Sequence, residues 1–141
     1  KAPVSLLILD IYHFKKVNDT YGHDIGDYVL IELVKMLKEL FPKDNEFVAR
    51  LGGEEFAVLL PDHQVKHAMV KAERALDRIR KEVLVHMDYK IKFTISIGIA
   101  ELMEGEDTQH WFKRADSALY HSKNNGRNQF TVAEKKFNDA A

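Results

Sequence analysis

The segment FVARLGGEEFAVLL, residues 47–60, is the part of the sequence that best defines the fold. Two short apolar runs, residues 47–51 and 56–60, flank a Gly-Gly-Glu-Glu sequence. Short apolar runs on either side of a glycine turn are typical of a β-hairpin. We therefore predict two antiparallel strands joined by a turn that carries two glycines and two carboxylates.

The segments around this hairpin alternate between helical and strand patterns. Apolar spacing predicts helices at residues 24–40, 65–83 and 111–122, and strands at residues 4–11, 90–101 and 130–132. This order predicts an α/β (α+β) fold, a ferredoxin-like split βαβ sheet with an extra hairpin and helices. We expect one domain over residues 1–133 and a frayed C-terminal tail over residues 134–141.

Composition limits the classes of function. The 141 residues are 45% hydrophobic, which is enough for the core of one domain. The 21 basic and 22 acidic residues nearly cancel, so we expect no nucleic-acid partner and no membrane contact by this domain. There is no cysteine and no apolar run of the roughly 18 residues that span a bilayer, which favours a cytoplasmic location.

The hairpin turn has the residue types of a phosphate and metal site. Gly52 and Gly53 let the backbone approach a phosphate, and Glu54 and Glu55 can hold a divalent ion. The alternative is an ordinary solvated turn. Asp10 ends the strand that a ferredoxin-like sheet sets beside the hairpin, so we predict Asp10 and Glu54 as a magnesium-binding pair.

Four separated stretches carry a family resemblance: LDIYHFKKVNDTYGHDIGD at residues 9–27, RLGGEEF at 50–56, SIGIA at 96–100 and ADSALYHSKNNGRNQF at 115–130. In this order and spacing they resemble the GGDEF family of diguanylate cyclases. The resemblance extends from residue 4 to about residue 132. It implies a nucleotidyl-cyclase-like domain that condenses two GTP molecules into cyclic di-GMP with release of pyrophosphate. Since each domain holds one nucleotide, it also implies a homodimer.

The resemblance assigns the catalytic and metal-binding roles. It implies that Asp10, the main-chain carbonyl of Ile11 and Glu54 hold Mg²⁺, with Mn²⁺ as an alternative. Glu55 is expected in the same site, either as acceptor of the hydroxyl proton or as support for the metal.

The resemblance also assigns the substrate contacts. The residues expected to bind the nucleotide are Phe14, Lys15, Asn18, His23, Asp27, Gly53, Lys123 and Arg127. Asn18 and Asp27 match the family's guanine readers, because an amide and a carboxylate can pair with the base's O6 and its N1 and N2 hydrogens. Lys15, Lys123 and Arg127 match the cations that meet the phosphates. A turn-stabilising role for His23 is an equal alternative.

One residue of the site departs from the family pattern. The strand motif of the family reads Asp-x-Asp, but its second acid is replaced by Tyr12. We expect metal binding to be retained and turnover to be reduced. The alternative function is a degenerate domain that binds GTP as a non-catalytic regulatory or interaction module. A third hypothesis, a cyclase that makes a single-nucleotide ring, fits the hairpin and the NDTYGHDIGD segment less well.

Two further departures concern regulation. Lys43 and Glu46 stand where the family has the Arg-x-x-Asp pair of its product-inhibition site. Lysine lacks the bidentate fork of arginine, so we predict weak or absent product inhibition. The family's helix ahead of the first strand is missing. We therefore expect a piece of a longer bacterial signalling protein with an upstream sensor or receiver domain, including the case of a membrane-bound sensor.

His63 and His67 are four residues apart, which is a spacing that can share a metal ion on a helix. No third ligand is near them in the sequence. We therefore predict that both side chains are solvated.

Overall fold

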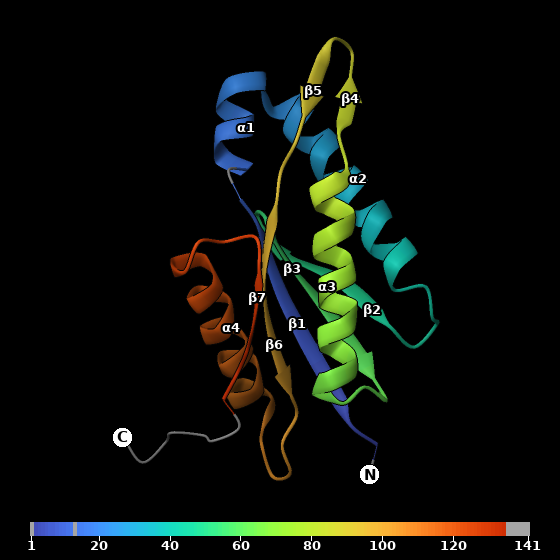
Figure 1. The fold of residues 1–141 in the computed structure, drawn as a ribbon, viewed down its shortest axis with the longest axis vertical. Helices are drawn as coiled ribbons and strands as arrows, with labels where there is room; N and C mark the ends of the chain where they lie inside the picture. Colours follow the sequence, from blue (N-terminus) through green and yellow to red (C-terminus); the bar gives the residue numbers. More distant parts are fainter. Residues whose placement is uncertain (1, 13, 135–141) are drawn as a thin grey trace.

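The computed structural model describes residues 2–12 and 14–134. Its main sheet has the strand order β2-β3-β1-β6-β7 (Figure 1). The strands are β1 (Val4–Ile11), β2 (Phe47–Gly52), β3 (Glu55–Pro61), β6 (Ile95–Glu101) and β7 (Phe130–Val132). Strand β1 is antiparallel to both β3 and β6, and β7 is parallel to β6 at the edge. The predicted split βαβ sheet is confirmed, with β7 added beside β6.

Helices cover both faces of this sheet. They are α1 (Phe14–Tyr21), α2 (His23–Leu40), α3 (Val65–Lys81) and α4 (Thr108–Asn124). Helix α4 lies on one face, and α2 and α3 lie on the other (Figure 1). A large hydrophobic core lies between the sheet and the α2–α3 layer. A smaller core under α4 contains Leu6, Ile8, Ala100, Ala115 and Leu119. Because both faces are covered, almost all of β1 is buried.

Gly98 explains how closely α4 approaches the sheet. A Cβ atom at this position of β6 would meet the carbonyl oxygen of Ala115 and the backbone nitrogen of Leu119. Only a residue without a side chain allows two backbones to come this near. Gly98 therefore lets α4 pack directly on β6, and the C-terminal end of α4 reaches the end of β1 through the bond from Lys123 to Asp10.

The secondary structure differs from the sequence prediction in two segments. Residues 90–101 do not form one strand, because β5 (Tyr89–Ile91) pairs with β4 (Leu84–His86) in a separate hairpin and β6 begins at Ile95. The apolar alternation continues unbroken through the buried Phe93, so the pattern hides the break. Helix α1 is the second difference, since the sequence pattern predicts no helix there.

The prediction for His63 is wrong. Its side chain is buried, and Nδ1 donates to the carbonyl oxygen of Pro61 at 2.8 Å. Its Nε2 lies 3.7 Å from the buried carboxylate of Glu46, which also accepts a hydrogen bond from Lys71 at 3.1 Å. His67 is exposed, as predicted. The pair is therefore one structural histidine and one surface histidine.

The tail predicted at residues 134–141 lies, apart from residue 134, outside the described residues. Within residues 2–12 and 14–134, no helix combines the length and the hydropathy required to cross a bilayer.

Candidate active site

The site is built at the end of β1, where three strands bring polar side chains together. Asp10 is directly opposite Glu55 of β3 on one side and Ser96 of β6 on the other. Side chains of directly opposed residues lie on the same face of a sheet, here the face covered by α4. The backbone N–H of Ile11 donates to the carbonyl oxygen of Glu54 at 3.3 Å, which attaches the hairpin turn to β1. The structure therefore brings Asp10 together with the two turn glutamates.

The conformation of the hairpin turn depends on its glycines and on an arginine. Gly53 has φ = 50°, in the left-handed region that costs a side-chain-bearing residue free energy. The guanidinium of Arg50 donates to the Gly53 carbonyl oxygen from Nε at 3.0 Å and from Nη2 at 2.7 Å. Sequence reasoning missed this role of Arg50, although an arginine two residues before the glycine pair is the available signal.

A cation from α4 completes the acidic cluster. The ammonium of Lys123 donates to Asp10 Oδ2 at 2.7 Å. Asp10 is 7% exposed, and its other oxygen, Oδ1, is buried with no hydrogen-bond partner among the described residues. An unpaired buried carboxylate oxygen is costly and is characteristic of a site that takes a ligand.

The two turn glutamates are perturbed by their surroundings. Partial burial raises the pKa of Glu54, and the nearby charge of Asp10 raises it further, while Lys123 opposes both. Burial also raises the pKa of Glu55, with further contributions from the carboxylates of Asp10 and Asp116 on α4. Asp116 was not singled out by the sequence. Perturbed carboxylates gathered around one point are typical of a functional site.

The donor set of this cluster fits a divalent cation with oxygen ligands. Among residues 2–12 and 14–134, no group of three or more acidic or histidine side chains could hold a metal ion by itself. Magnesium is usually held by one or two carboxylates, with substrate phosphates and water filling the other positions. Asp10, with its orphaned Oδ1, and Glu54 match that arrangement.

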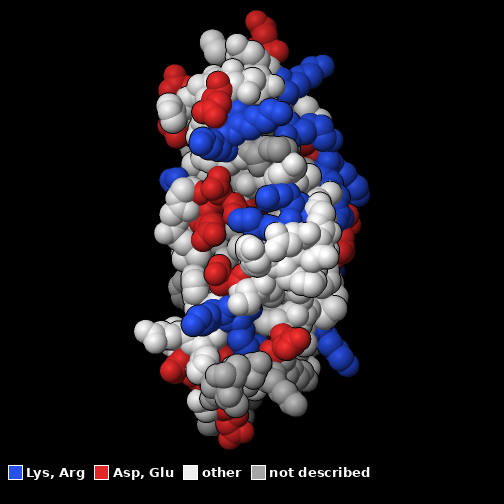
Figure 2. All heavy atoms as spheres, turned by 90° about the vertical axis from the view of Figure 1, so that its left-hand side faces the viewer, with Lys and Arg blue, Asp and Glu red and all other residues white. Residues whose placement is uncertain are grey.

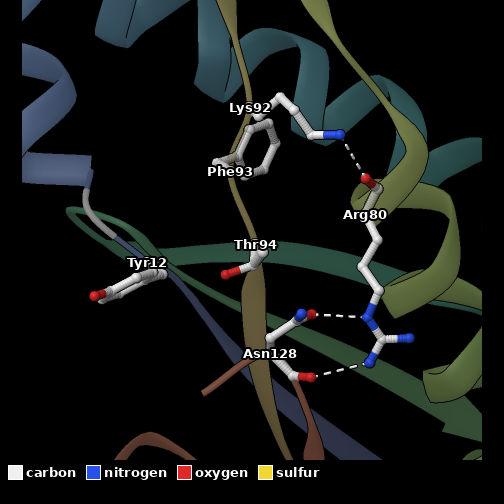
Figure 3. A pocket seen from close by; sticks show the side chains of 6 residues that line it. All are labelled: Tyr12, Arg80, Lys92, Phe93, Thr94 and Asn128. Atoms are coloured by element: carbon white, nitrogen blue, oxygen red, sulfur yellow. Dashed lines mark hydrogen bonds between the residues drawn. The ribbon is translucent and has the colours of Figure 1, made fainter. Parts of the chain in front are cut away.

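The two predicted phosphate-binding cations near the end of α4 have different neighbours. Lys123 is paired with Asp10, whereas the guanidinium carbon of Arg127 lies 4.6 Å from the centre of the Tyr12 ring. The turn that carries Arg127 is held from the other face of the sheet, since Arg80 of α3 donates two hydrogen bonds to Asn128 (Figure 3). A pocket of about 440 Å³ lies here, lined by Tyr12, Arg80, Lys92, Phe93, Thr94 and Asn128.

The predicted guanine readers lie on α1 and α2. Phe14 is buried and anchors α1, while Lys15 is exposed. Asn18 packs against Gly26 of α2, where a Cβ atom would meet its Oδ1, and this oxygen is buried without a partner among the described residues. Asp27 follows Gly26 and is exposed. The amide and the carboxylate therefore lie on neighbouring positions of one helix pair.

His23 is exposed as the first residue of α2. With the residues that the structure describes, His23 makes no contact that separates a nucleotide-binding role from a turn-stabilising one. On the face of the molecule that carries α4, acidic and basic side chains lie next to one another around the middle of the surface (Figure 2).

The sequence model described as "Diguanylate cyclase, GGDEF domain" matches residues 1–129. The chain belongs to the GGDEF family. This GGDEF domain is 41% identical over 135 residues to Diguanylate cyclase A of Treponema denticola, which covers 95% of the chain and 36% of that protein. It is 42% identical over 133 residues to the response regulator PleD of Caulobacter vibrioides, which covers 89% of the chain and 28% of that protein. The chain thus spans about a third of the length of these curated relatives.

Solved structures show the same GGDEF fold. The GGDEF domain of DgcB from Caulobacter crescentus, in complex with c-di-GMP, superposes with a TM-score of 0.89 at 35% identity and covers 94% of this chain and 79% of that chain. The active GGEEF domain of a diguanylate cyclase from Vibrio cholerae has a TM-score of 0.86 at 32% identity, covering 96% of this chain and 85% of that chain.

Proposed function

We propose that this GGDEF domain is a diguanylate cyclase, which condenses two GTP molecules into cyclic di-GMP and releases pyrophosphate. The observation that carries the proposal is the cluster of Asp10, Glu54 and Glu55 at the glycine turn, with Lys123 against it. The Vibrio cholerae domain described as active is named for a GGEEF sequence, which this chain has at residues 52–56.

Asp10, the Ile11 carbonyl and Glu54 would hold Mg²⁺, with Mn²⁺ as a substitute. The metal supplies neutralisation of the charge on the reacting phosphates. Asp10 suits this role because Oδ1 is buried and has no protein partner among the described residues. Lys123 would then exchange its bond to Asp10 for the phosphates, which keeps a cation in the site at each stage.

In the proposed reaction, the 3′ oxygen of one GTP forms a bond to the α-phosphorus of the other. The bond from that phosphorus to the bridging oxygen breaks, and pyrophosphate leaves. The same displacement by the second 3′ oxygen at the first α-phosphorus closes the ring and releases a second pyrophosphate. Glu55 accepts the hydroxyl proton, a role favoured by its raised pKa, which makes it a stronger base than an ordinary glutamate. Lys15, Lys123 and Arg127 bind the phosphates, and the backbones of Phe14 and Gly53 approach them.

Guanine specificity is assigned to Asn18 and Asp27. The Asp27 carboxylate would accept from N1 and N2 of guanine, and the Asn18 amide would donate to O6. Adenine lacks the N1 and N2 hydrogens, so it would leave Asp27 unpaired. We also assign to nucleotide binding His23, which is exposed at the start of α2.

Catalysis would require a homodimer, because each domain holds one nucleotide and the reaction joins two. The curated relatives are about three times as long as this chain, and one of them is named a response regulator. We therefore place this domain as the output of a longer signalling protein with an upstream sensor or receiver domain. Because GTP is the proposed substrate, the proposed location of the reaction is the cytoplasm.

The main alternative is a GTP-binding module without turnover, and Tyr12 in place of an acid favours it. The deciding experiment incubates the dimeric protein with GTP and Mg²⁺ and identifies products by mass. Cyclic di-GMP supports the cyclase, and a ring made from one nucleotide would indicate a different cyclase. GTP binding without product, from protein that retains its native upstream region, would overturn the catalytic proposal.

The Tyr12→Asp variant restores the acid of the family pattern. We expect its kcat to rise severalfold, since Tyr12 is proposed to lower turnover without abolishing it. An unchanged kcat would show that the second acid is dispensable in this chain.

A further inference from the structure

Tyr12 lies where the chain departs from its family, and its ring has a specific neighbour. The guanidinium carbon of Arg127 is 4.6 Å from the ring centre. Tyr12 follows directly after β1, which ends at Ile11, and its backbone N–H donates to the carbonyl oxygen of Thr94 at 2.9 Å. We infer that Tyr12 is a positioning residue, whose ring holds the Arg127 guanidinium in place for the terminal phosphates of GTP. The inference rests on the proposed function, which assigns Arg127 to those phosphates.

An aromatic ring can hold a guanidinium in place without occupying the N–H donors of the guanidinium. The face of an aromatic ring attracts the cation, and the N–H donors point outward in the guanidinium plane. Within residues 2–12 and 14–134, the Arg127 side chain makes no hydrogen bond or ion pair, in contrast to Lys123, which is bound to Asp10. Arg127 therefore keeps its two-pronged donor edge for a phosphate.

A carboxylate at position 12 would act differently on the same guanidinium. It would hold the guanidinium by accepting hydrogen bonds from its N–H groups, whereas the ring of Tyr12 holds it through its face. It would also add a negative charge near Glu54 and Glu55, where the charge of Asp10 already raises the pKa of both glutamates. The ring holds the cation and leaves the charge balance of the site unchanged.

The backbone of the turn that carries Arg127 has an unusual conformation, which the surrounding contacts must hold. Gly126, Arg127 and Asn128 have φ values of 108°, 61° and 53°. Left-handed residues other than glycine are strained, and such residues gather at ligand clamps. Arg80 holds Asn128 through its side-chain and backbone oxygens, each at 2.9 Å (Figure 3). Arg80 thus holds the residue next to Arg127 in the turn, and the Arg127 side chain lies over the ring of Tyr12.

The test measures binding by calorimetry with Mg²⁺ present, using a GTP analogue with a methylene bridge between the α and β phosphorus atoms. The variants are Tyr12→Phe, Tyr12→Leu, Arg127→Met and the Tyr12→Leu/Arg127→Met double variant. Tyr12→Leu should weaken analogue binding about two- to fivefold, the range of one cation–π contact. Tyr12→Phe keeps the aromatic ring and should bind the analogue as tightly as the unaltered protein does. The double variant should bind no more weakly than Arg127→Met alone.

GMP separates positioning from general damage, because it lacks the terminal phosphates. Its affinity should be the same for Tyr12→Leu and the unaltered protein. Tyr120→Leu, an exposed tyrosine on α4, is the matched control and should leave analogue binding unchanged. Three results would overturn this inference and leave the proposed function standing. Tyr12→Leu could bind the analogue as tightly as the unaltered protein, it could lose as much affinity for GMP as for the analogue, or the double variant could bind the analogue more weakly than Arg127→Met. Failure of the unaltered protein to bind either nucleotide would overturn the proposed function as well.

Discussion

Lys123 and Asp10 form an ion pair with 2.7 Å between Nζ and Oδ2, although 113 residues separate them in the chain. The pair connects the C-terminal end of α4 to the end of β1, and it places a cation among three carboxylates. The proposed function gives each partner a new contact when the ligands bind, the phosphates for Lys123 and the metal for Asp10. The pair therefore stabilises the site before the substrate arrives.

Lys123→Met should destabilise the ligand-free domain. The substitution leaves the buried Asp10 carboxylate without its partner, at a cost of about 1–3 kcal/mol in the free energy of unfolding. Mg²⁺ should recover much of this loss, because it supplies the missing positive charge. Thermal unfolding with and without Mg²⁺ measures both effects.

Lys113→Met is the control for this experiment, since Lys113 is exposed on the same helix. Its unfolding temperature should match that of the unaltered protein. If Lys123→Met were equally neutral without Mg²⁺, the ion pair would not stabilise the ligand-free site.

Glu54→Gln should stabilise the ligand-free domain at neutral pH. Burial and Asp10 raise the pKa of Glu54 in the folded state, so its protonated form is favoured by folding. The stability from this preference is present below the unfolded pKa of about 4.3 and is lost as the pH rises through the higher folded pKa. A glutamine cannot ionise and should add about 0.5 kcal/mol at pH 7, a small effect because Glu54 is partly solvated.

Urea unfolding at pH 7 and near pH 4 tests the sign. The advantage of Glu54→Gln should shrink at the lower pH, where the glutamate of the unaltered protein takes up a proton. A gain of the same size at both pH values would mean that charge is not its cause.

Gly26→Ala should weaken GTP binding and leave the fold intact. A Cβ atom here would displace the Asn18 side chain, which is flexible, and alanine is the better helix former by about 1 kcal/mol. We expect GTP affinity to fall about three- to tenfold, the value of one hydrogen bond, with less discrimination against ATP. Calorimetry with GTP and ATP measures this change.

Gly98→Ala is the contrasting variant. Its Cβ atom would meet the backbone of α4 at Ala115 and Leu119, which cannot move as a side-chain end can. We expect a loss of about 1–3 kcal/mol in stability. If Gly26→Ala destabilised the domain as much and spared nucleotide affinity, the proposed role of Asn18 would be wrong.

Cyclic di-GMP should inhibit the domain weakly or not at all. The Glu46 carboxylate is buried, bonded to Lys71 at 3.1 Å and close to His63, so it is committed inside the protein. Lys43 cannot make the bidentate contact of an arginine. Initial rates measured with added cyclic di-GMP should be unchanged, also in Lys43→Arg. Tight binding of cyclic di-GMP to the purified domain would contradict this prediction.

Local pattern predicted much of the fold. The apolar run at Val4–Ile11 is β1, the hairpin is β2 and β3, and residues 130–132 are β7. The predicted helix at residues 24–40 differs from α2 by one residue. These elements are recognisable because each buries a continuous face, and the periodicity of that face is a property of the segment alone.

The missed elements lack such a face. Helix α1 has eight residues and buries only Phe14 and Val17, too short a stripe for helical periodicity to be recognised. Residues 90–101 show one alternation across two strands, because Phe93 is buried between β5 and β6 although it belongs to neither. The local sequence around His63 does not indicate burial, because the carboxylate that it faces belongs to Glu46, which lies before the hairpin.

The sequence by itself determined which chemical groups the site contains: the carboxylates at the end of β1 and in the glycine turn, and the cations at the end of α4. The tertiary structure alone decided which groups meet. It paired Asp10 with Lys123 and stacked Arg127 on Tyr12. Periodicity is a local property, whereas these distances depend on strand order and on how closely α4 packs against Gly98. Contacts across a hundred residues therefore had to be observed in the folded chain.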